Sequence, residues 1–174
     1  MCTSRPKGGA TAPFLALLAG MVLFELGGAR WLPPIVAAHF DAAGHANGFM
    51  PRTAYVGLML VVGVLAPLFI TVVPLRAMRR PGARINLPDP SYWLAPERRD
   101  ATLNHLSRQV VRFASMLTLF LGYVQTLVVV ANRATPPRLP MHGLVAGLLV
   151  FLVSVFVWLL AFARHFRRAP AGLG

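Results

Sequence analysis

The sequence predicts an all-α integral membrane protein, a bundle of four transmembrane helices with both termini in the cytoplasm. Four apolar runs of 17 to 22 residues are the first observation, because a helix needs roughly 20 residues to cross the hydrocarbon core of a bilayer. Lipid offers the backbone no hydrogen bonds, so runs of this kind form helices. The predicted spans cover residues 13–29, 54–75, 113–131 and 143–163.

Composition is the second observation. Hydrophobic residues make up 56% of the 174-residue chain and charged residues 13%, against roughly 25% charged in soluble domains. Glu25 is the only charged residue inside the four runs. We therefore expect a single membrane domain over residues 1–174, with no separate soluble domain.

The third observation is the uneven placement of Lys and Arg. With the N-terminus inside, 13 of them fall in inner segments and 4 in the outer loops at residues 30–53 and 132–142. Cytoplasmic loops collect basic residues, so the net charge of +12 indicates orientation in a membrane rather than nucleic-acid binding. Residues 76–112 are expected to lie against anionic lipid headgroups.

The first run has a second interpretation, as a secretory signal peptide with a weak cleavage site at Gly27-Gly28-Ala29. Glu25 interrupts the apolar run, and an even number of spans agrees with the charge asymmetry. Both points favour a retained span, whereas cleavage would leave three.

Prolines predict features of two helices. Pro67 lies well inside the second run and should kink it, because proline removes one backbone hydrogen bond. Pro96 is suited to the first turn of a helix that we expect to continue to Ala131, with its first third outside the hydrocarbon. One face of this helix is predicted to carry Leu103, Leu106, Val110, Phe113 and Leu117.

Aromatic residues lie at the predicted membrane boundaries. Trp31 ends the first span, and Tyr92 and Trp93 precede the long helix beside arginines. Indole and phenol rings favour the headgroup level, so we expect an interfacial belt rather than a ligand cage.

The first outer loop carries the most distinctive pattern. Gly44 and the pair Asn47-Gly48 are turn signals, because Gly and Asn tolerate positive φ angles. The candidate binding residues of this loop are His39, Phe40, Asp41, Gly44, Asn47, Gly48, Phe49 and Arg52.

This loop pattern resembles a bacterial membrane-domain family of unknown function, which also forms the N-terminal part of the SdpI-type bacteriocin immunity proteins. The segments 85–88, 92–94 and 96–99 are similar to the short, domain-only form of that family, as is the pair Ala131-Asn132. The resemblance covers roughly residues 14–133 and implies a motif outside the membrane. The chain lacks the additional C-terminal spans of the immunity proteins.

A metal site is the alternative use of this loop. His39, Asp41 and His45 are ligand types for zinc, but their spacing matches no regular zinc motif. We favour a structural role in which Asp41 forms an Asx-turn and Asn47-Gly48 a hairpin-like turn.

Glu25 is a separate candidate site. An ionisable group inside a span usually has a partner or a function, and Gln125 should lie at a similar depth. The carboxylate could be protonated within a cavity, or it could fix the register of the helices through a buried hydrogen bond or ion pair.

Three functions are consistent with these patterns. The leading hypothesis is a non-catalytic module that binds a peptide, a lipid or another membrane protein through the first outer loop. The alternatives are a small transporter or transporter subunit that uses Glu25, and a metal-dependent enzyme that uses the His39 cluster. We expect no cofactor, and the pattern leaves a homo-oligomer open.

Overall fold

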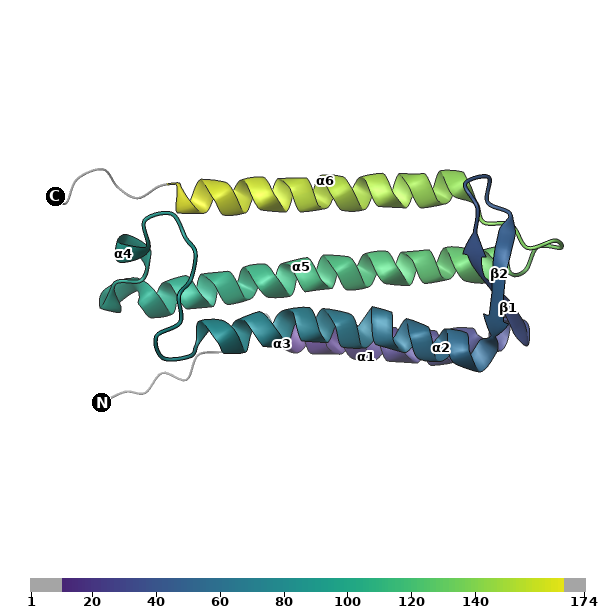
Figure 1. The fold of residues 1–174 in the computed structure, drawn as a ribbon, viewed down its shortest axis with the longest axis horizontal. Helices are drawn as coiled ribbons and strands as arrows, with labels where there is room; N and C mark the ends of the chain where they lie inside the picture. Colours follow the sequence, from purple (N-terminus) through teal and green to yellow (C-terminus); the bar gives the residue numbers. More distant parts are fainter. Residues whose placement is uncertain (1–10, 168–174) are drawn as a thin grey trace.

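The structure is a computed structural model, and it describes residues 11–167. Four helical segments are long and apolar enough to cross a membrane: Thr11–Trp31, Arg52–Met78, Pro96–Ala131 and Met141–Phe166. They run along one common axis (Figure 1). The prediction of four membrane-spanning helices is therefore confirmed at the level of length and composition.

Shorter elements complete the chain order. The helical elements are α1 (Thr11–Gly28), η1 (Ala29–Trp31), α2 (Arg52–Leu60), η2 (Val61–Leu65), α3 (Ala66–Met78), α4 (Pro90–Trp93), α5 (Pro96–Ala131) and α6 (Met141–Phe166). The strands β1 (Ile35–Phe40) and β2 (Ala46–Pro51) lie between η1 and α2.

The second span contains a π-helical turn immediately before Pro67, the residue at which the sequence predicts a kink. Elements α2, η2 and α3 follow one another without a break, and η2 ends two residues before Pro67. Proline cannot donate to a carbonyl four residues back, and its ring crowds that carbonyl. The wider turn of η2 places the disruption immediately before the proline.

Helix α5 begins at Pro96 and ends at Ala131, as predicted. Its 36 residues span about 54 Å, well beyond a hydrocarbon core of about 30 Å. Leu103 and Leu106 are buried against Phe166 of α6 and Leu87 of the preceding loop. The start of α5 therefore packs on protein, as the predicted apolar face required.

Helix α5 is the centre of the bundle. It contacts α1 and α3 as well as α6, and α6 lies on the opposite side of α5 from the other two (Figure 1). Phe166 is the only buried residue of α6. The remaining apolar side chains of α6 are therefore suited to lipid.

One end of the bundle is closed by an antiparallel β-hairpin, so the all-α prediction is wrong there. β1 pairs with β2 in a register that joins Ala37 to Phe49 and His39 to Gly48, with irregularities around residue 38. The turn falls at residues 41–45, and Asn47-Gly48 lies within β2 instead of forming the turn we predicted. We call this end, with residues 29–51 and 132–140, the hairpin end.

Candidate functional site

Asp41 shapes the turn of the hairpin. Its Oδ1 accepts hydrogen bonds from the backbone N–H groups of Ala43, at 2.9 Å, and His45, at 2.8 Å. The predicted Asx-turn is confirmed. These bonds, above all the one from His45, favour the carboxylate and hold the pKa of Asp41 below its usual value.

Gly44 joins the turn to the loop between α5 and α6. Its φ angle is +83°, and its carbonyl accepts a hydrogen bond of 2.8 Å from the N–H of Leu139. A Cβ atom at this position would lie 2.6 Å from the Leu139 carbonyl oxygen. Gly44 is therefore needed both for its conformation and for this close approach.

The Asn132 side chain connects β1 to the end of α5 through hydrogen bonds. Its Oδ1 accepts from the Ala37 N–H at 2.8 Å, and its Nδ2 donates to the Ala37 carbonyl at 3.0 Å and to the Val128 carbonyl at 2.9 Å. The side-chain amide thus pairs with Ala37 as a neighbouring strand would. In the sequence, Asn132 enters only through the family resemblance and has no predicted structural role, although a lone amide at the end of an apolar helix was the available signal.

The other motif residues divide into packing and exposed groups. Phe40 packs against the apolar core of the hairpin end, and Arg52 donates from Nε to the Pro33 carbonyl at 3.2 Å. Phe49 is 57% exposed, as is the neighbouring Ile35, and Asn47 is exposed beside them in β2. The exposed apolar pair Ile35 and Phe49 is named the hairpin rim below.

The candidate metal ligands are not assembled. His39 packs across Gly48, where a Cβ atom would lie 2.9 Å from the His39 side chain. His45 Nδ1 lies 3.4 Å from Asp41 Oδ2, and both residues are exposed. Among residues 11–167, no three His, Cys, Asp or Glu side chains are grouped so that they could hold a metal ion.

Glu25 and Gln125 belong to a buried polar cluster in the bundle core. Both side chains are fully buried, and the Tyr55 hydroxyl donates to Gln125 Oε1. Glu25 Oε1 would lie 3.9 Å from a Cβ atom on Gly63 of the π-turn. Neither the Glu25 oxygens nor Gln125 Nε2 has a partner among the described residues.

This cluster extends what the sequence suggested. The similar depths of Glu25 and Gln125 were predicted, but Tyr55 was not, because a tyrosine in an apolar run gives no sign of its direction. The π-turn beside Glu25 was also missed. A buried carboxylate without a partner is energetically costly, so the cluster is a candidate functional site.

The aromatic residues at the opposite end cover the start of α5. The Arg98 guanidinium lies 4.1 Å from the centre of the Tyr92 ring. Trp93 packs edge-on against Tyr92 and Phe166, each at 5.1 Å between ring centres, and is only partly exposed. Trp93 therefore attaches the segment before α5 to the end of α6.

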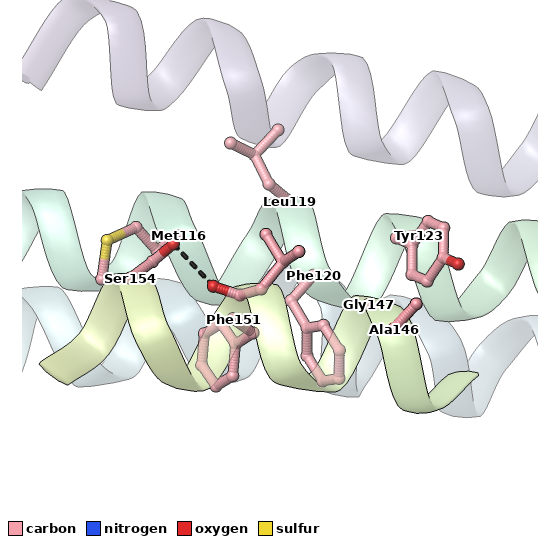
Figure 2. Close-up of a pocket in the computed structure, with 9 residues that line it drawn as sticks. Met116, Leu119, Phe120, Tyr123, Ala146, Gly147, Phe151 and Ser154 are labelled. Atoms are coloured by element: carbon pink, nitrogen blue, oxygen red, sulfur yellow. Dashed lines mark hydrogen bonds between the residues drawn. The ribbon is translucent and has the colours of Figure 1, made fainter. Parts of the chain in front are cut away.

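A groove of about 440 Å³ lies between α5 and α6 (Figure 2). Its two hydroxyl groups are already engaged, since Ser154 donates to the Val150 carbonyl at 2.7 Å and Tyr123 to the Gly143 carbonyl at 2.8 Å. The rest of the lining is apolar, including Met116, Phe120 and Phe151. The groove offers a contact surface for hydrocarbon and no reactive group.

The fold and these sites define a mostly helical protein with four potential membrane spans, a hairpin at one end and a buried polar cluster in the core. No family model, curated protein or solved structure matches the chain. The resemblance of the hairpin motif to the immunity-protein domain therefore stays a prediction.

Proposed function

We propose that the protein is a non-catalytic binding module of a bacterial inner membrane, which recognises a peptide or a membrane protein through the hairpin rim. The observation that carries this proposal is the division of the loop motif. Asp41 fixes the turn, and Gly44 and Asn132 hold the hairpin to the loop after α5 and to the end of α5. Phe49 and Ile35 remain exposed.

This division suits recognition rather than chemistry. A hairpin fixed in advance loses little conformational entropy on binding, so its contacts contribute more to affinity. Exposed aromatic side chains are frequent anchors in protein interfaces. The basic asymmetry of the sequence supports an outward-facing hairpin end, which agrees with the family resemblance.

Site-specific photocrosslinking in intact cells tests the proposal. A photoreactive phenylalanine analogue at Phe49 is compared with the same analogue at Phe156, which is 60% exposed on the outer face of α6. We expect a discrete peptide or protein adduct from position 49, lost in an Asn132→Ala background, and lipid adducts alone from position 156. Lipid adducts alone from both positions would contradict it.

A second candidate function rests on Glu25, whose two oxygens have no partner within the described part of the chain. We propose as the alternative that this carboxylate accepts and releases a proton within a small transporter or transporter subunit. Proton flux into proteoliposomes loaded with a pH-sensitive dye tests it directly. Proton flux that is lost in the Glu25→Gln variant and retained in Glu97→Gln supports the transport function. Equal proton flux in both variants contradicts it.

A further inference from the structure

Two guanidinium groups converge on one exposed tryptophan at the hairpin end. The Arg30 guanidinium lies 5.3 Å from the centre of the Trp31 ring, and that of Arg133 lies 4.8 Å from it. The two arginines are far apart in the sequence. All three side chains are exposed. Positive charge from η1 and from the end of α5 is therefore concentrated at one place on the surface.

Within residues 11–167 this charge has no acidic partner. The only ion pair found there joins His45 to Asp41, and neither arginine takes part in it. Glu25 is the nearest carboxylate along the chain, but it is fully buried. The site is thus complementary to an anion that the described part of the chain does not supply.

An apolar groove begins at the same place and runs along the line between α1 and α5. Its upper part, which is the part nearer the hairpin end, has a volume of about 310 Å³ and is bounded by Arg30 and Trp31. Its lower part, of about 460 Å³, shares Phe24 and Thr126 with the upper part and reaches Ala16. The Thr126 hydroxyl donates to the Gly122 carbonyl at 3.0 Å and the Thr118 hydroxyl to the Ala114 carbonyl at 2.9 Å. Beyond Arg30 and Trp31, the lining therefore offers no free hydroxyl donor.

The dimensions of this groove match one leaflet of a bilayer. Ala16 and Arg30 are 14 residues apart, which corresponds to about 21 Å along a helix, against about 20–22 Å for one leaflet that includes its headgroup region. An occupant must therefore be apolar over one leaflet and anionic at the membrane surface. A glycerophospholipid has this arrangement of groups.

We propose that the groove between α1 and α5 binds an anionic glycerophospholipid. An acyl chain lies against Phe24, and the phosphate accepts hydrogen bonds from Arg30 and Arg133. Guanidinium groups bind phosphate oxygens in a paired geometry, and the indole of Trp31 is suited to the same headgroup level. This site is separate from the hairpin rim and does not depend on the proposed function.

Lipid-dependent thermal unfolding of the purified protein in neutral detergent tests the proposal. We expect phosphatidylglycerol to raise the unfolding midpoint at concentrations at least about tenfold below those needed with phosphatidylcholine. The rise should be lost in an Arg30→Gln/Arg133→Gln variant. It should persist in a control with the same charge change at the opposite end, Arg80→Gln/Arg84→Gln.

A second pair of variants tests the acyl-chain contact without removing charge. A Cβ atom added at Gly27 or at Gly57 meets no atom within 4 Å, but only Gly27 lines the groove. We expect Gly27→Leu to weaken the response to phosphatidylglycerol and Gly57→Leu to leave it intact.

Three outcomes of the lipid experiments would overturn the assignment. They are an equal response to phosphatidylcholine, a full response in the double arginine variant, and a full response in Gly27→Leu. A midpoint raised as much by inorganic phosphate as by the lipid would identify a plain anion site and would also contradict it.

Discussion

The Asn132 side chain and the Ala37 backbone form a reciprocal pair of hydrogen bonds, in which Oδ1 accepts from the N–H and Nδ2 donates to the carbonyl. Ala37 is fully buried, so its backbone groups need these partners. The pair joins residues that are 95 positions apart in sequence. It fixes the hairpin relative to the end of α5 and so determines where the hairpin rim lies.

Replacing Asn132 with Ala should therefore destabilise the hairpin end. Buried backbone groups left without a partner cost about 1–3 kcal/mol, and we expect a loss of free energy of unfolding in this range. Thermal unfolding in detergent measures it, with Asn104→Ala on the exposed surface of α5 as the control. Faster hydrogen exchange confined to β1 and β2 should accompany the loss, and unchanged exchange there would contradict the assigned role.

The hairpin turn should be sensitive to acid through Asp41. Its pKa is lowered in the folded protein from the ordinary value of 3.8, because the carboxylate accepts two backbone hydrogen bonds. The stabilising effect is therefore fully present above pH 3.8 and is lost as the pH falls through the lower, folded value. Amide hydrogen exchange of Ala43 and His45 measures it. In Asp41→Asn this acid dependence should vanish, and its persistence would show that another group is responsible.

Substitution of Gly147 by a larger residue should disrupt the packing of α5 against α6. A Cβ atom at Gly147 would lie 2.1 Å from Cε1 of Tyr123, whose hydroxyl is held by the Gly143 carbonyl. Overpacking of this kind typically costs about 1–3 kcal/mol. Gly147→Ala should lower the unfolding midpoint, whereas Gly57→Ala, which meets no neighbour, should not. Equal midpoints for the two variants would contradict the close approach of α5 and α6.

The polar cluster should respond in opposite directions to two conservative substitutions. Glu25→Gln removes a buried carboxyl group that has no partner among residues 11–167, and we expect a higher unfolding midpoint at alkaline pH, where the carboxyl group would have to carry a charge. Tyr55→Phe leaves Gln125 Oε1 without its donor, and we expect a loss of about 1–3 kcal/mol. A lower midpoint for Glu25→Gln would indicate that the carboxylate has a stabilising partner.

The sequence predicted the helices well because their physical signals are local. Apolar length identified the four spans, and Pro96 marked the start of α5. The Asx-turn at Asp41 was also predictable, since its hydrogen bonds reach only four residues along the chain.

The features that sequence reasoning missed depend on contacts between distant segments. Asn132 gains its role from Ala37, and Tyr55 gains its role from Gln125 at a separation of 70 residues. Asn47-Gly48 was misassigned as a turn because the close packing of Gly48 under His39 has no signature in the sequence. Arg30 contributes to a candidate anion site only because Arg133 lies beside the same Trp31 ring, and the sequence does not show that proximity.

We infer from the placement of basic residues that the chain crosses the membrane with the hairpin end outside and the basic segment before α5 inside. Single cysteines in a Cys2→Ser background test it, one at Ala42 in the exposed turn and one at Arg84 in the exposed basic loop. A membrane-impermeant thiol reagent applied to intact cells should modify Ala42→Cys and reach Arg84→Cys only after the cells are opened. Labelling of Arg84→Cys in intact cells, with Ala42→Cys protected, would invert the orientation and contradict recognition at the cell exterior.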